Sequence, residues 1–92
     1  MNFPTFDEFR QKALADGFDE VIAREWAPNT VLDTHTHAFG VHAILTHGEM
    51  WLTMNGQTQH LLPGSIFELE PNVPHDECYG TEGAAYWVAR KN

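Results

Sequence analysis

Histidine is the residue type in this chain whose spacing points most directly to chemistry. His35, His37 and His42 lie within eight residues of one another, and His75 follows far downstream, directly after Pro74. On an extended chain, side chains alternate between two faces, so His35 and His37 point the same way and are close enough to share one ion. Neutral imidazole is a common ligand of divalent transition metals. Our hypothesis is that His35, His37, His42 and His75 converge on one divalent metal ion inside a small β-barrel.

Each histidine also has a simpler interpretation. An isolated His-x-His pair is more often two surface histidines in a loop. His42 stands at an odd separation from His37, so strict alternation places it on the opposite face. A ligand role for His42 requires a bulge or bend at Gly40 that resets the register by one residue. If His42 does not bind, the metal has three protein ligands and an additional open position. His47 and His60 are expected to lie in solvent.

A short amphipathic helix is predicted near the N-terminus. Thr5 is a good N-cap, and Glu8 three residues later completes a capping box. Gly17 is a natural end for the helix. We expect residues 1–18 to form a packing element or lid that carries no chemistry. Its apolar face follows a helical spacing through four residues, Phe6, Phe9, Ala13 and Leu14.

From residue 20 onward, short runs broken by turn residues predict strands. Asn55-Gly56 is a strong hairpin signal, and His47-Gly48-Glu49 is predicted to be a turn. Seven or eight short strands at regular intervals indicate an antiparallel sandwich or barrel spanning residues 19–92. The expected strands are residues 21–26, 31–37, 41–46, 50–54, 57–62, 65–69, 75–79 and 84–90.

Composition narrows the classes of partner. Ninety-two residues make one domain. The net charge of −8, with 13 acidic against 5 basic residues, argues against a nucleic-acid partner or an anionic membrane surface. Cys78 is the only cysteine, so no disulfide framework is expected. The sequence has no signal-peptide pattern and no long apolar run, which makes the cytoplasm the default location.

Residues 28–79 resemble the small single-domain cupins (cupin 2 type, RmlC-like jelly roll), which hold a metal inside a β-barrel. The first cupin motif, His-x-His followed by an acidic ligand and a glycine, is matched by His35-Thr36-His37, His42 and Gly48. The second motif, from a Pro-Gly turn to a Pro-His pair, is matched by Pro63-Gly64 and Pro74-His75. Two positions depart from the pattern. His42 stands where cupins most often have Glu, and Glu70-Pro71-Asn72 replaces the usual Pro-x-Gly.

The resemblance implies an all-β fold, a cupin jelly-roll β-barrel (double-stranded β-helix) with one short N-terminal α-helix. It also implies a divalent transition metal (Zn, Fe, Ni or Mn) and a small-molecule ligand or substrate. Three functions follow from it: a metal-dependent enzyme of the dioxygenase or Lewis-acid isomerase or lyase type, a non-catalytic ligand-sensing module, and a purely structural metal. The small size of the chain, and the dimers common among the cupins that it resembles, favour a homodimer with exposed strand edges as its interface.

The sequence offers few further candidates for catalysis. Asp76, Glu77 and Glu68 are candidate general bases if any of them points inward, although acidic residues in turns are usually solvated. Cys78 is expected to be a small buried residue rather than a reactive one. The catalytic residues themselves are not identified by the sequence.

Overall fold

A computed structural model describes residues 4–92 of the chain. Helix α1 (Phe6–Ala15) begins with the predicted capping box. The backbone N–H of Glu8 donates to the Thr5 hydroxyl at 3.1 Å, and the backbone N–H of Thr5 donates to the Glu8 carboxylate at 2.9 Å. Gly17, at φ +95°, follows the helix end. Of the helical segment expected at residues 1–18, residues 1–3 lie outside the described part of the chain.

Six strands follow the helix within residues 4–92, and all of their pairings are antiparallel. The two long strands, β3 and β6, pair with each other from Gly40 opposite Lys91 to Met54 opposite His75. Each of them covers two of the strands expected from the sequence. The strands are β1 (Glu20–Trp26), β2 (Val31–His35), β3 (Gly40–Met54), β4 (Gln57–Leu61), β5 (Ile66–Leu69) and β6 (His75–Lys91).

The turn predicted at residues 47–49 is therefore wrong, because β3 continues through it. Gly48 has φ +80° and Gly83, on β6, has φ +71°. The ladder between the two strands shifts register on either side of Gly48, as β-bulges do. A Cβ on Gly48 would lie 2.1 Å from the carbonyl oxygen of Gly83. Both long strands thus bend at facing glycines without losing their pairing.

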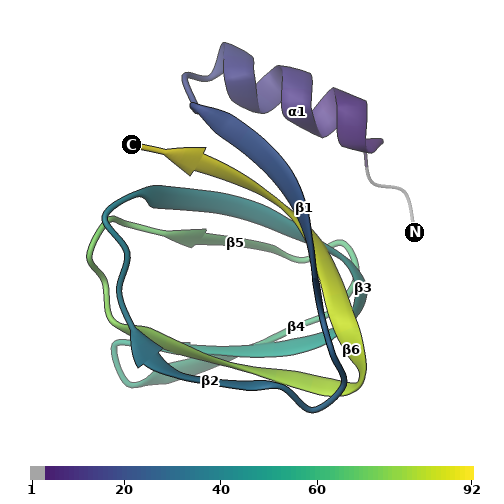
Figure 1. Cartoon of the computed structure of the whole chain (residues 1–92), viewed down its shortest axis with the longest axis vertical. Helices are drawn as coiled ribbons and strands as arrows, with labels where there is room; N and C mark the ends of the chain where they lie inside the picture. The colour runs from purple at the N-terminus through teal and green to yellow at the C-terminus, as the bar shows by residue number, and fades with distance from the viewer. Residues whose placement is uncertain (1–3) are drawn as a thin grey trace.

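The bends divide the sheet into two facing layers (Figure 1). In one layer, β1 and β5 flank the second half of β6 and the first half of β3. In the other, β2 and β4 flank the first half of β6 and the second half of β3. This is the predicted all-β jelly roll with one short helix. The side chains between the layers form the main core, which includes Leu45, Met50 and Leu52, all 0% exposed.

Helix α1 packs on the outer face of the first layer, above β1 and the end of β6 (Figure 1). Phe9 and Ala13 contact Ile44 and Ala89 in a second apolar cluster outside the barrel. Leu14, on the predicted apolar face, is 38% exposed and so contributes less than its spacing indicates. Within residues 4–92, no helix is long and apolar enough to cross a membrane.

Candidate metal centre

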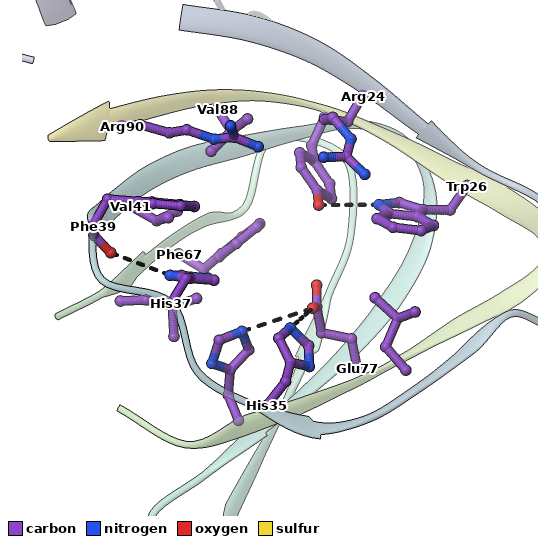
Figure 2. A pocket seen from close by; sticks show the side chains of 14 residues that line it. Arg24, Trp26, His35, His37, Phe39, Val41, Phe67, Glu77, Val88 and Arg90 are labelled. Atoms are coloured by element: carbon purple, nitrogen blue, oxygen red, sulfur yellow. Dashed lines mark hydrogen bonds and ion pairs between the residues drawn. The ribbon is translucent and has the colours of Figure 1, made fainter. Parts of the chain in front are cut away.

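The facing ends of β2 and β6 bring the candidate ligands together. His35 is the last residue of β2 and pairs with His75, the first residue of β6. Glu77 lies two residues beyond His75 on the same strand, so both side chains point to the same face. These three side chains, together with His37, line a cavity of about 240 Å³ inside the barrel (Figure 2).

Three donor atoms in this cavity are spaced as metal ligands would be. The Oε2 atom of Glu77 lies 3.5 Å from Nε2 of His35 and 3.8 Å from Nε2 of His75. One donor atom from each of the three residues lies within 4.8 Å of the other two. Atoms bonded to one metal ion at about 2.0–2.2 Å are separated from one another by roughly 3 to 3.5 Å. Small side-chain movements are enough to close the remaining gap.

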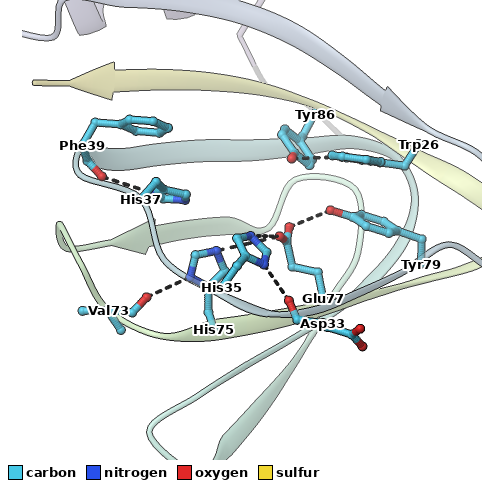
Figure 3. Close-up of polar contacts among 10 residues, drawn as sticks. All are labelled: Trp26, Asp33, His35, His37, Phe39, Val73, His75, Glu77, Tyr79 and Tyr86. Carbon is cyan, nitrogen blue, oxygen red and sulfur yellow. Dashed lines mark hydrogen bonds and ion pairs between the residues drawn. The ribbon is translucent and has the colours of Figure 1, made fainter.

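The two imidazole rings are already oriented for metal binding. The Nδ1–H group of His35 donates to the carbonyl oxygen of Asp33 at 2.7 Å, and that of His75 donates to the carbonyl oxygen of Val73 at 2.9 Å (Figure 3). A carbonyl oxygen can only accept, so in each neutral ring the proton is on Nδ1 and the lone pair is on Nε2. Backbone contacts of this kind fix the tautomer and ring orientation of metal-binding histidines.

Glu77 is the buried charge of the site. It is 6% exposed, and its Oε1 atom accepts a hydrogen bond from the hydroxyl of Tyr79 at 2.6 Å. Burial raises the pKa of Tyr79 far above its usual range, so this hydroxyl remains a donor. A carboxylate removed from water needs a compensating cation or further donors. The Oε2 atom of Glu77 faces the Nε2 atoms of His35 and His75, so a cation between these three residues would meet that need.

His37 faces the same cavity from the segment after β2. Its ring centroid lies 4.9 Å from that of His75, and its ring is stacked on Phe39 at 4.3 Å. Its Nδ1–H group donates to the carbonyl oxygen of Phe39 at 3.2 Å, which leaves Nε2 as an acceptor. Burial lowers the pKa of His37, which favours the neutral ring. The donor atoms of His37 lie outside the 4.8 Å group, so its role as a ligand stays a prediction.

The structure does not bring His42 to the other three histidines. The ladder from Gly40 to Leu45 is regular on β3, so no bulge turns His42 inward, and Val41 lines the cavity instead. His42 points to the outer face under helix α1. Its ring centroid lies 6.0 Å from those of both Phe9 and Phe18, and its Nδ1 atom lies 3.8 Å from Glu68. The expected four-histidine convergence is therefore wrong at this residue.

The remaining candidates lie apart from the cavity. His47 and His60 are exposed, as expected, although His60 contacts Glu49 at 2.6 Å and stacks on Trp51. Glu68 is exposed on the outer face beside His42. Two residues of β6, Asp76 and Cys78, are half-buried and do not line the cavity.

Glu77 was considered from the sequence only as a candidate base, not as a metal ligand. The sequence nevertheless contains a pattern that indicates a ligand role for Glu77, because His75-Asp76-Glu77 has the same two-residue spacing as His35-Thr36-His37. On a strand, that spacing places both polar ends on one face. His42 stands at the position where the cupin motif most often has Glu, and the carboxylate that lines the cavity is that of Glu77 on β6.

Comparison with known families agrees with this fold. Residues 17–89 match the AraC-like ligand binding domain. The chain belongs to this family. A curated relative in Haemophilus influenzae, an uncharacterized HTH-type transcriptional regulator, is 34% identical to this AraC-like domain over 53 residues. That stretch is 58% of the chain but only 18% of the regulator.

Solved structures place the AraC-like domain among the cupins by fold. The cupin domain of Cnp3 from Schizosaccharomyces pombe has a TM-score of 0.72 at 12% identity, covering 82% of this chain and 57% of that one. A DMSP lyase structure has a TM-score of 0.72 at 20% identity, covering 78% of this chain and 37% of that one. A protein of unknown function from Rhizobium leguminosarum matches nearly end to end, with a TM-score of 0.70, 18% identity, and coverage of 99% and 96%.

Proposed function

We propose that this AraC-like domain binds a divalent transition metal through His35, His75 and Glu77 and, through that metal, a small oxygen-bearing molecule. One observation supports this most strongly. A 6%-exposed carboxylate faces two imidazoles whose Nδ1 atoms contact backbone carbonyls, so that one donor atom from each of the three residues lies within 4.8 Å of the other two. A cation stabilises a carboxylate and two imidazoles that are grouped in this way.

The donor set narrows the choice of metal. Imidazole nitrogen suits Zn, Fe, Ni and Mn to different degrees, whereas Ca²⁺ and Mg²⁺ prefer oxygen ligands alone. Two histidines with one carboxylate, leaving open positions, are found at non-haem iron centres, and three protein ligands are also typical of catalytic zinc. A bound metal of this kind supplies Lewis acidity to an oxygen group of the ligand.

The surrounding residues have separate tasks. The carbonyl oxygens of Asp33 and Val73 hold the His35 and His75 rings, and the Tyr79 hydroxyl orients Glu77. His37 offers an unprotonated Nε2 toward the cavity, which can accept a proton from a bound molecule or complete the ligand set.

Catalysis of the dioxygenase or Lewis-acid isomerase or lyase type is the first candidate role, because three protein ligands leave positions for a substrate beside a proton acceptor. Ligand sensing is the second. It is favoured by the family to which the chain belongs and by the transcriptional regulator among its relatives. In both roles the same cavity takes up the small molecule.

Titration with Co²⁺, whose visible absorption reports its ligands, tests the metal centre. The wild type is expected to bind one equivalent, and the His75→Gln and Glu77→Gln variants are expected to lose most of the affinity, by about tenfold to a hundredfold or more. His60→Gln and Glu49→Gln are matched controls, since this pair lies on the surface. Binding that survives both cavity substitutions, or that depends on the surface pair, would contradict the proposal.

A second measurement separates catalysis from sensing. The metal-loaded protein is incubated with a panel of small hydroxy, oxo and dicarboxylic acids and followed by NMR and by oxygen consumption. Turnover that His75→Gln abolishes supports catalysis. Saturable binding without turnover supports sensing. A metal without any exchangeable position would leave only a structural role.

A further inference from the structure

Building on the proposed metal centre, we infer that the cavity accepts a small organic acid carrying a second oxygen group. The carboxylate of this acid pairs with Arg24 and Arg90, and the other oxygen group reaches the cluster formed by His35, His75 and Glu77. The inference rests on Arg24 and Arg90, which line the wall of the cavity opposite His35 and Glu77.

Two of the five basic residues of the chain line this one cavity. Arg24 comes from β1 and Arg90 from the end of β6, and both point inward (Figure 2). Figure 2 shows them along the wall opposite His35 and Glu77, on either side of Val88. A molecule that spans the cavity therefore meets the donor cluster at one end and guanidinium groups at the other.

Arg24 is not neutralised by the protein. Its guanidinium lies 4.8 Å from the centre of the Trp26 ring, and among residues 4–92 no carboxylate lies within ion-pair distance of it. Guanidinium groups present a fork of donors that matches a carboxylate. Arg24 is thus a positioned cation, held by an aromatic ring, with its donors available to a ligand.

Arg90 is only partly neutralised. One terminal nitrogen donates to Glu20 at 3.1 Å, and the guanidinium lies 4.8 Å from the centre of the Phe39 ring. Its Nε–H group is buried and has no hydrogen-bond partner within the described residues. Buried donors are nearly always paired, so the guanidinium of Arg90 retains unused hydrogen-bonding capacity beside the cavity that its side chain lines.

The balance of charges in the cavity also favours an anionic ligand. Within the described residues, Glu77 is the only carboxylate that lines it, against two guanidiniums. A divalent cation at Glu77 makes the cavity more positive still, although the chain as a whole carries a net charge of −8. An enclosed excess of positive charge is stabilised by an anionic ligand.

The volume limits the size of the acid. The cavity volume of about 240 Å³ falls below the range of about 300–1,000 Å³ found for drug-sized ligands. We therefore assign the cavity to acids of few carbons, with a dicarboxylic acid or a hydroxy or oxo acid as the class that offers oxygen at both ends.

Calorimetric titration of the Co²⁺-loaded full chain with malonate, succinate and glutarate tests this inference. At least one of these dicarboxylates is expected to bind about tenfold or more tightly than acetate, which reaches only one end, or than the diol of the same length. Arg24→Gln is expected to reduce dicarboxylate affinity about tenfold and to leave unchanged that of the diol, which has no carboxylate to pair with Arg24. Arg10→Gln removes the same charge from the exposed face of helix α1 and should have no effect.

The outcomes separate the two proposals. Retained Co²⁺ absorption in Arg24→Gln, with lost dicarboxylate binding, supports the inference. Equal binding of diol and dicarboxylate, or no dicarboxylate binding to a protein that holds Co²⁺, overturns it and leaves the metal centre standing. Failure to bind Co²⁺ at all would instead overturn the proposed function.

Arg90→Gln serves as a second variant. Its thermal unfolding is measured as well, because this substitution also removes the contact with Glu20.

Discussion

Glu77 is the residue on which the proposed centre depends most. Its Oε1 atom is held by the Tyr79 hydroxyl at 2.6 Å, and its Oε2 atom is left to face His35 and His75. Neutralising this side chain with Gln keeps its shape but removes the charge that attracts a cation. The three residues thus act as a unit, in which each imidazole is fixed by its own backbone carbonyl.

His42 provides a test at the scale of one residue. Because its ring lies between Phe9 and Phe18 on the outer face, His42→Ala is expected to lower the free energy of unfolding by about 1 kcal/mol through lost packing. Its Co²⁺ affinity should equal that of the wild type. Urea unfolding and metal titration of the same sample measure both. A loss of metal affinity in this variant would show that His42 belongs to the centre.

Buried tyrosines predict a dependence of stability on alkaline pH. Burial raises the pKa of Tyr79 and of Tyr86 above the usual value for tyrosine, which is about 10. The unfolded chain therefore releases these protons first, so stability is full below about pH 10 and falls as pH rises above it, by about 1.4 kcal/mol per pH unit for each tyrosine. Urea unfolding between pH 9 and 11 should show a smaller slope in Tyr79→Phe. An unchanged slope would refute this assignment.

The sequence predicts part of this site, for reasons that are visible in particular residues. The common face of His35 and His37 follows from strand alternation, whereas His75 was expected because Pro74-His75 resembles the second cupin motif. His42 could not be placed, since a one-residue shift in register reverses its face, and no local signal says whether Gly40 carries a bulge. The sequence also could not predict that Glu77 faces His35, because this contact depends on the pairing of β2 with β6, which lie about forty residues apart in the chain.

At the scale of elements, the bends in β3 and β6 create the cavity. Gly48 pairs with Ala84, next to Gly83, and both glycines have positive φ where the two backbones approach closely. The first half of β6 carries His75 and Glu77, and its second half carries Arg90. Bending one strand thus brings the two walls of the cavity face to face. The sequence predicted strands on both sides of each bend but not their continuity, because glycine signals a turn and a bulge equally well.

Substitution of these glycines measures the contribution of the bend. Gly48→Ala is expected to destabilise the domain strongly, by roughly 3 kcal/mol or more, because its Cβ would lie 2.1 Å from the Gly83 carbonyl oxygen. Gly56→Ala is the matched control, since Gly56 also has positive φ but no atom within 4 Å of the new Cβ. It should cost only about 1 kcal/mol for the backbone conformation. Equal losses in thermal unfolding would argue against the close approach.

At the scale of the whole molecule, the two layers enclose the cavity, whereas the helix covers an apolar surface outside the barrel. Helix α1 closes an apolar face on the outside of the barrel through Phe9 and Ala13, and it does not line the cavity. Its capping box and apolar spacing were readable from the sequence because both are local signals. The cavity lies between the layers, so its shape depends on long-range pairing that local signals do not encode.

Metal binding should stabilise the whole domain. If the ion binds only the folded chain, a concentration one hundred times the dissociation constant adds about 2.7 kcal/mol to the free energy of unfolding. For a domain of this size that corresponds to a rise in melting temperature of roughly 10–20 °C. Calorimetry with Zn²⁺ and then with a chelator measures the rise and its reversal. Glu77→Gln should show little of either, and an equal rise in that variant would point to binding elsewhere.

The most direct measurement of the central claim is anomalous diffraction from crystals of the metal-loaded chain, recorded at the absorption edge of the metal. The account predicts one strong peak inside the barrel, within bonding distance of Nε2 of His35, Nε2 of His75 and Oε2 of Glu77. A peak at His42 and Glu68, a peak at His60 and Glu49, or no peak in the cavity at saturating metal would contradict it.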